Sequence, residues 1–301
     1  MTLPTRQELA TSLLDSVYAE ELMEVMDILR GQGYVAIVSD GWSDPNSESV
    51  TNFMIVSLLI RTIFWSSTRS RDKQHTGEYI ATVMATVIEK VERVAGKGSV
   101  CAVVTDNASN MRKSWELLEE RLHTLTCNGC SAHTPYLLLK DMFGIGFIGD
   151  VLTKAVAITK FVRKRPALLY HFRAKQRQRL GSRQRRRALM IPVSTRWYPK
   201  TNCISSVVAN EVVLRDVFLN AELVSRYSNA TVKLNQVQAN LADSTFWTEA
   251  RVVLRLGNPV IKVLGALERD GCCLSMVYHY FCKLKNNDLY KREIVMSTLE
   301  F

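Results

Sequence analysis

Residues 38–44, VSDGWSD, and residues 100–110, VCAVVTDNASN, each carry an aspartate where an apolar run stops. Both runs are short and rich in β-branched residues, so each predicts a buried strand. If the two strands are neighbours in one sheet, Asp40 and Asp106 meet near the strand ends. Two carboxylates so close repel each other unless a cation lies between them, as in a Mg²⁺ site. The alternative is that each aspartate caps a turn or a helix.

The pattern around these strands predicts a mixed sheet flanked by helices. Compact apolar runs mark the strands, and apolar residues at helical spacing mark the helices between them. The segment DGWSDPNSES (40–49) is predicted to be a turn, because Asp, Asn, Ser, Gly and Pro cluster there. In chain order we expect a helix at 8–30, strands at 34–39, 49–60 and 62–68, a helix at 77–95, a strand at 99–105, a helix at 109–123, a strand near 124–127 and a helix at 133–142.

The second half of the chain has only helical patterns. Residues 151–190 are expected to be helical and very basic, and further helices are expected at 204–226, 232–241 and 245–268. Gly257, Asn258 and Pro259 are expected to break the last of these helices. The fold class is therefore α/β, followed by the start of an all-α region.

Positive charge is concentrated in one block of the sequence. Residues 151–210 contain fifteen Lys or Arg and no Asp or Glu, whereas the rest of the chain contains 24 basic and 29 acidic residues. Such a block predicts contact with an anionic polymer.

The composition is that of a soluble globular protein, with 47% hydrophobic and 23% charged residues. No run of eighteen apolar residues and no secretory signal pattern is present, so we expect no membrane partner. The seven cysteines form no regular framework, which favours reduced thiols in the cytosol or the nucleus.

Cys127, Cys130 and His133 have the spacing C-x2-C-x2-H. A tetrahedral zinc site needs a fourth ligand, and none follows at the usual spacing. Zinc binding therefore stands beside two other interpretations, a phosphate contact by His133 and an inward cysteine next to a helix cap.

Three blocks together resemble the hAT superfamily of DNA transposases: VSDGWSDPNSESVTNFMIV, AVVTDNASNM and CSAHTPYLLLKD. More closely, they are similar to the domain-of-unknown-function family that carries the ribonuclease-H-like core of these enzymes. The blocks occur in the family's order between residues 33 and 141, and the resemblance resumes with STRW at 194–197. It implies a ribonuclease-H-like sheet in which Asp40 and Asp106 are catalytic ligands of Mg²⁺ or Mn²⁺.

The resemblance also implies how DNA is held. His133, in the family's C-x-x-H motif with Cys130, and Arg196 are expected to contact phosphates, and Trp197 to stack on a displaced base. The alternative for Trp197 is a core position. We expect Arg183, Arg185, Arg186 and Arg187 to contact DNA as well, although such basic runs also serve as nuclear localisation signals or are simply solvated.

A third catalytic acid, a Glu after a long helical insertion, is also expected from the family. No matching motif surrounds Glu211, Glu249, Glu268 or Glu293, so the resemblance implies a C-terminally truncated and catalytically incomplete enzyme. We expect an N-terminal amphipathic helix in residues 1–33, a transposase core in 34–200 with its basic segment at 151–190, and an incomplete helical insertion in 201–301.

The expected function is that of a nuclear, hAT-transposase-derived DNA-binding protein with a partial strand-transfer site. Two alternatives remain open at this stage. One is a domesticated transcriptional regulator or scaffold that forms a homo-oligomer through its helical region. The other is an active Mg²⁺-dependent nuclease that uses a carboxylate from the helical tail.

Overall fold

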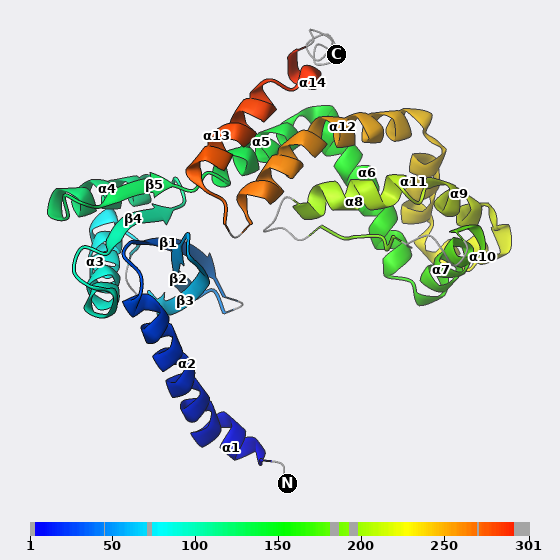
Figure 1. The fold of residues 1–301 in the computed structure, drawn as a ribbon. Coiled ribbons are helices and arrows are strands. Elements are labelled where there is room, and N and C mark those ends of the chain that lie inside the picture. Colours follow the sequence, from blue (N-terminus) through cyan, green and yellow to red (C-terminus); the bar gives the residue numbers. More distant parts are fainter. Residues whose placement is uncertain are drawn as a thin grey trace. The chain divides into compact units, whose positions relative to one another are not determined.

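The computed structural model describes residues 4–44, 46–70, 74–180, 187–192, 198–269 and 271–291 (Figure 1). The chain divides between His133 and Thr134 into two compact units, a sheet unit and a helical unit, which we describe separately. The helices before residue 200 share one hydrophobic core with the helices after it.

The sheet unit contains every strand in the described part of the chain. Its elements are α1 (Arg6–Ala10), α2 (Ser12–Arg30), β1 (Val35–Ser43), β2 (Ser49–Ser57), β3 (Ile60–Arg69), α3 (Gly77–Ala95), β4 (Val100–Thr105), α4 (Ser109–Arg121) and β5 (Thr126–Gly129).

The five strands form one mixed sheet in the order β3-β2-β1-β4-β5. The first three strands pair antiparallel, and β1–β4 and β4–β5 pair parallel. The order of elements is the predicted one, and the topology is ribonuclease-H-like. The α/β fold class and the side-by-side placement of the strands before Asp40 and Asp106 are thus confirmed.

Helices α3 and α4 cover one face of this sheet. Along β1, Val35 and Ile37 are buried while the residues between them are less so, which is the two-residue alternation of a strand with one covered face. Helix α3 buries Ala81, Met84 and Ile88, spaced by three and four residues, against the same cluster. Apolar periodicity therefore fixes which face of the sheet is the core.

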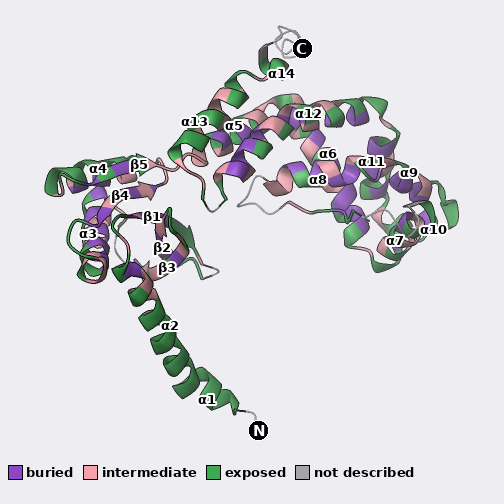
Figure 2. Ribbon diagram, viewed as in Figure 1, coloured by how far each residue is buried: buried purple, intermediate pink, exposed green. Residues whose placement is uncertain are grey.

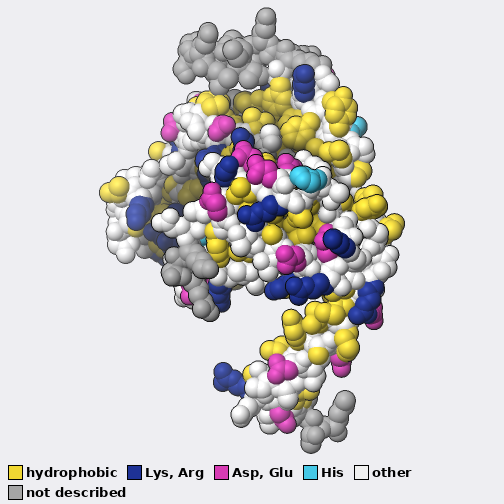
Figure 3. All heavy atoms as spheres, turned by 90° about the vertical axis from the view of Figure 1, so that its left-hand side faces the viewer, with side chains coloured by type: hydrophobic (Ala, Val, Ile, Leu, Met, Phe, Trp, Pro, Cys, Tyr) yellow, Lys and Arg dark blue, Asp and Glu magenta, His cyan; other side chains and the backbone are white. Residues whose placement is uncertain are grey.

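The N-terminal helices are amphipathic but largely unburied (Figure 2). Helix α1 begins with a capping box between Thr5 and Glu8, and α2 buries only Leu29 in the core of the unit. Hydrophobic side chains lie at the surface of this segment beside acidic ones (Figure 3). The large apolar residues exposed here are Leu9, Leu13, Leu14, Val17, Tyr18 and Met23.

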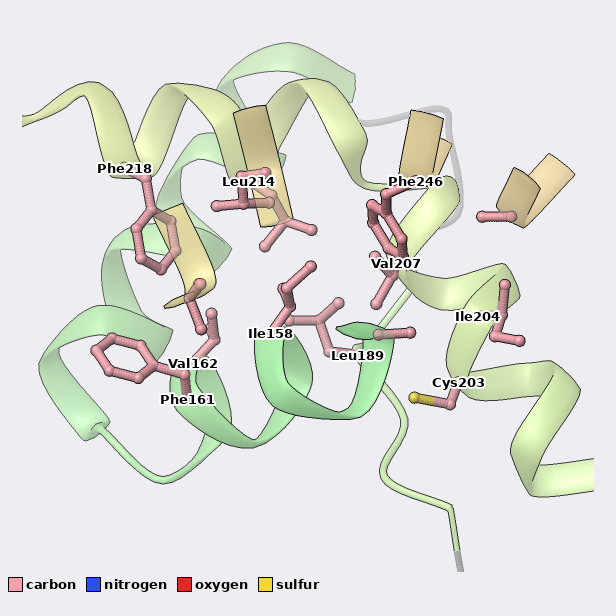
Figure 4. Packing of buried hydrophobic residues seen from close by; sticks show 14 of the residues in the cluster. Ile158, Phe161, Val162, Leu189, Cys203, Ile204, Val207, Leu214, Phe218 and Phe246 are labelled. Carbon is pink, nitrogen blue, oxygen red and sulfur yellow. The ribbon is translucent and has the colours of Figure 1, made fainter. Parts of the chain in front are cut away.

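The helical unit has its own hydrophobic core, part of which Figure 4 shows. Ile158 and Val162 from one helix contribute to it together with Val207, Leu214 and Phe246 from later helices. The elements are α5 (His133–Gly144), α6 (Gly146–Arg163), α7 (Pro166–Leu180), α8 (Tyr198–Val208), α9 (Glu211–Leu219), α10 (Ala221–Ser225), the 3₁₀ turn η1 (Ser228–Ala230), α11 (Thr231–Ala242), α12 (Ser244–Leu267), α13 (Leu274–Lys285) and α14 (Asp288–Lys291).

Among the described residues, no single helix is long and apolar enough to cross a membrane. Helices α5 and α6 pass that test only when they are taken together, and the chain bends by 87° between them. Both helices contribute side chains to the core of the helical unit.

The predicted break at Gly257–Pro259 is wrong, because α12 continues through Pro259. A proline inside a helix removes one backbone hydrogen bond and costs about 3 kcal/mol. Side chains on both sides of it are buried, among them Val253 before the proline and Val260 and Leu264 after it. Burying each such side chain contributes about 1.5–3 kcal/mol, so tertiary packing outweighs the local cost.

Candidate metal and nucleic-acid site

Asp40 and Asp106 occupy matching positions on neighbouring strands. Val38 of β1 pairs with Val104 of β4 in the parallel ladder, and each aspartate lies two residues further along its own chain segment. Since side chains alternate along a strand, Asp40 lies on the face of β1 that carries Val38, opposite the face covered by α3. Asp106 directly follows the end of β4. Neighbouring strands are about 4.8 Å apart, so the two carboxylates start from adjacent backbones.

Asp40 is held within a strand and not in the predicted turn. Strand β1 continues to Ser43, and Asp40 pairs with Asn52 of β2. The turn is shorter than predicted because Asp44 closes it: its Oδ1 accepts hydrogen bonds from the backbone N–H groups of Asn46 and Glu48, at 2.8 and 2.9 Å. The Asp40 residue is exposed to solvent.

Asp106 directly follows β4 and is fixed by its neighbours. Its Oδ1 accepts a hydrogen bond of 2.9 Å from the backbone N–H of Ala108, the residue that precedes α4. One oxygen therefore closes a turn before a helix, as the capping interpretation expected. Among the described residues, no hydrogen bond is made to Oδ2, and this second oxygen remains for a ligand. Capping and ligand binding are thus compatible.

The backbone at Asp106 is held by Thr105. The Thr105 hydroxyl donates to the Asp106 carbonyl oxygen at 2.9 Å and accepts from the Trp115 indole Nε1–H at 3.1 Å. Trp115 lies on α4, so the helix that follows the aspartate also positions it. The Thr105 carbonyl oxygen accepts from the N–H of Cys130 at 2.6 Å, which joins β4 to the segment after β5.

Asn107 and Gly129 interlock beside the aspartate. A Cβ atom on Gly129 would lie 1.5 Å from Asn107 Oδ1, far inside contact distance. The Asn107 side chain thus occupies the space that a side chain at position 129 would take, so a larger residue there would displace it. Sequence reasoning missed this contact, because a close approach between a strand end and the residue after a neighbouring strand leaves no periodic signal.

His133 begins α5, and its N–H donates to the Cys130 carbonyl oxygen at 3.0 Å. Its side chain is half-buried. The C-x-x-H segment is thus tied through Cys130 to Thr105, one residue before Asp106.

The structure does not bring Cys127, Cys130 and His133 together as a zinc site. Within the described residues, no three His, Cys, Asp or Glu side chains are close enough to share a metal ion. Cys127 lies in the core of the sheet unit, and burial, with a smaller effect of Glu119, raises its pKa to about 12. These three residues therefore do not form a zinc site in the described part of the chain.

No third His, Cys, Asp or Glu side chain joins Asp40 and Asp106 in the described part of the chain. Glu211, one of the acids considered as a third ligand, forms ion pairs with Arg215 and Arg251 inside the helical unit. Glu249 and Glu268 also lie in the helical unit, and Glu293 is outside the described residues.

Most of the predicted DNA-contacting residues lie outside the described residues, namely Arg183, Arg185, Arg186, Arg196 and Trp197. Arg187 is described. Its carbonyl oxygen accepts from the side-chain amides of Gln176 and Asn210 at 2.8 and 3.0 Å, and its guanidinium donates to Ser205 Oγ at 3.3 Å. The end of the Arg-rich run is therefore anchored on the helical unit.

Charge differs between the two parts of the chain. Residues 1–133 contain 12 Lys or Arg and 17 Asp or Glu, a net charge of −5, whereas residues 134–301 contain 27 and 12, a net charge of +15. A surface that attracts a polyanion is thus a property of the helical unit, while the two aspartates belong to the sheet unit.

The sheet order defines a ribonuclease-H-like domain, in which Asp40 on β1 and Asp106 just after β4 each lie two residues beyond the paired Val38 and Val104. The chain belongs to the family described as "Domain of unknown function (DUF659)", whose profile matches residues 4–158, just over half of the sequence. This domain is found in hAT-like transposase-derived proteins. No curated protein matches the chain.

Proposed function

We propose that this chain is a DNA-binding protein derived from a hAT transposase, with a site for Mg²⁺ or Mn²⁺ at Asp40 and Asp106. The observation that supports the proposal is the matching position of the two aspartates on β1 and β4 of a ribonuclease-H-like sheet. Carboxylate oxygens are the ligands that these cations prefer. A cation bound there would neutralise phosphate charge and activate water in phosphodiester chemistry.

Each of the proposed site residues would have its own role. Asp40 would supply a carboxylate from the exposed part of β1, and Asp106 would supply Oδ2 while Oδ1 holds the turn before α4. His133 and Arg196 would contact phosphates, and Trp197 would stack on a displaced base, as the resemblance to the transposases implies. We propose a nuclear location, because the proposed ligand is DNA.

We further propose that this chain alone binds DNA without cleaving it. Two carboxylates hold a divalent cation more weakly than three, and they hold a second cation poorly. No third acid joins Asp40 and Asp106 among the described residues. The proposal therefore separates metal binding, which two ligands support, from strand transfer.

Metal binding tests the proposed site directly. We expect the full chain to bind Mn²⁺, measured by electron paramagnetic resonance of the free ion, and Asp40→Asn and Asp106→Asn each to weaken this binding at least tenfold. Asp15→Asn is the matched control, since Asp15 is an exposed aspartate on α2. Mn²⁺ affinity that is equal in the wild type and both site variants would remove the site from the proposal.

Plasmid nicking then separates binding from catalysis. In Mg²⁺ the wild-type chain is expected to leave supercoiled plasmid intact while retarding it on a gel. Nicking that disappears in Asp40→Asn would show instead an active nuclease with a further ligand, which is the alternative left open by the sequence.

A further inference from the structure

The outer face of α7 carries one aromatic and two arginine side chains in a row. The inner face of this helix is formed by Leu168, Phe172 and Gln176, which are buried. Tyr170, Arg173 and Arg177 are spaced by three and four residues, so they share the opposite face of the helix. All three side chains are exposed, and Tyr170 has 64% of its surface accessible.

Two neighbouring arginines, Arg179 on α7 and Arg165 in the segment between α6 and α7, form contacts within the fold. Arg179 forms an ion pair with Asp216 at 2.6 Å, and the Arg165 guanidinium lies 3.6 Å from the centre of the Phe161 ring. For Arg173 and Arg177, the described part of the chain provides no ion pair. They lie in the acid-free block, so no neighbour in sequence competes with a phosphate for them.

Tyr170 has a large, exposed aromatic ring and precedes the two arginines on α7. Among the described residues, the Tyr170 ring contacts the ring of His171. The two ring centres are 5.7 Å apart, and the angle between the ring planes is 84°. An exposed aromatic ring can stack on the face of an unpaired base. A base inside a duplex is already stacked on its neighbours, so its face is not accessible. Arg173 and Arg177 are about 6 Å apart along the helix axis, so one strand running along α7 can reach both.

We infer that Tyr170, Arg173 and Arg177 form a binding surface for single-stranded DNA. Tyr170 stacks on one unpaired base, and the two arginines contact phosphates of the same strand. The inference rests on the proposed function, which supplies DNA as the source of the strand. It adds a residue-level surface on the helical unit that is separate from the Arg-rich run at 183–187.

Fluorescence anisotropy of the full chain with labelled dT20 and with a 20-base-pair duplex tests this surface. One stacked base is worth about 1–3 kcal/mol, so Tyr170→Ala should weaken dT20 binding about five- to 150-fold. Duplex affinity should stay unchanged in that variant. Tyr170→Trp should bind dT20 at least as tightly as the wild type, because indole also stacks. Arg173→Ala with Arg177→Ala should weaken dT20 binding and reduce its salt dependence.

Two control variants match these changes in exposure and chemistry. Tyr18→Ala removes a tyrosine that is 66% exposed on the acidic helix α2, and Arg226→Ala removes an exposed arginine that is paired with Glu222. Both should leave dT20 affinity within twofold of the wild type.

The outcomes separate this inference from the proposed function. Equal dT20 affinity in the wild type and Tyr170→Ala would overturn the inference while leaving DNA binding intact. A chain that binds neither dT20 nor duplex would overturn both. Equal competition by poly-glutamate and unlabelled dT20 would show a general polyanion surface, and binding of U20 without dT20 would show an RNA site. Either result contradicts a DNA strand at Tyr170.

Discussion

At the residue scale, the acid after β4 is positioned by contacts from three segments of the chain. Thr105 is bonded to the Trp115 indole of α4, and its carbonyl oxygen is bonded to Cys130 after β5. Asn107 lies over Gly129. The sequence pattern indicated Asp106 itself, because the apolar run before it clearly predicts a strand. The contacts that hold Asp106 come from segments that meet only after folding, so the spacing of residues along the sequence does not predict them.

Replacing Gly129 tests this close approach. Gly129→Ala places a methyl group against Asn107 Oδ1, so we expect the free energy of unfolding to fall by about 1–3 kcal/mol, as in other overpacked sites. Urea denaturation followed by circular dichroism measures the change. Gly144→Ala is the control, since a Cβ there meets nothing within 4 Å. Similar stability in the two variants would contradict the interlock.

At the element scale, periodicity predicted strands and helices well, and its errors have identifiable causes. The order of strands and helices in the sheet unit follows from apolar runs and helical spacing. The segment after Ser39 was predicted as a turn from its residue types, but pairing with β2 extends the strand to Ser43. Helix α12 was predicted to break at Pro259, but buried side chains on both sides keep it continuous. In both cases a partner distant in sequence decided the local structure.

Pro259→Ala is therefore expected to stabilise the protein. The substitution restores a backbone N–H within α12, and we expect the free energy of unfolding to rise by about 1–3 kcal/mol. Pro166→Ala is the matched control, because Pro166 is the first residue of α7, where no intrahelical partner is lost. Thermal unfolding should show a higher midpoint for the first variant only; an unchanged midpoint would mean that α12 depends on Pro259 in some other way.

At the scale of the whole molecule, the family match and the structural units have different boundaries. The match ends at residue 158, inside α6, whereas the compact units divide at residue 133. Helix α6 buries Ile148, Val151 and Ile158 against helices that follow later in the chain. The matched segment therefore contains one complete unit and a part of the second.

A fragment that ends at residue 158 should consequently be poorly folded at its C-terminal end. It retains Ile148, Val151 and Ile158 but lacks the helices that cover them. We expect it to bind the dye ANS several-fold more strongly than the full chain and to aggregate in light scattering. A fragment ending at residue 132 is the control, since it stops before α5. A monomeric 158-residue fragment with low dye binding would contradict the shared core.

The double use of the Asp106 carboxylate has a thermodynamic consequence. Because one oxygen of Asp106 accepts a hydrogen bond from the Ala108 amide, ligand binding at the other oxygen and fraying of the first turn of α4 would be linked equilibria. A ligand that favours the ordered carboxylate slows solvent exchange at that amide, and loosening of the turn lowers the ligand's affinity by the same factor. Hydrogen exchange at the Ala108 amide would therefore report the binding of a ligand by Asp106.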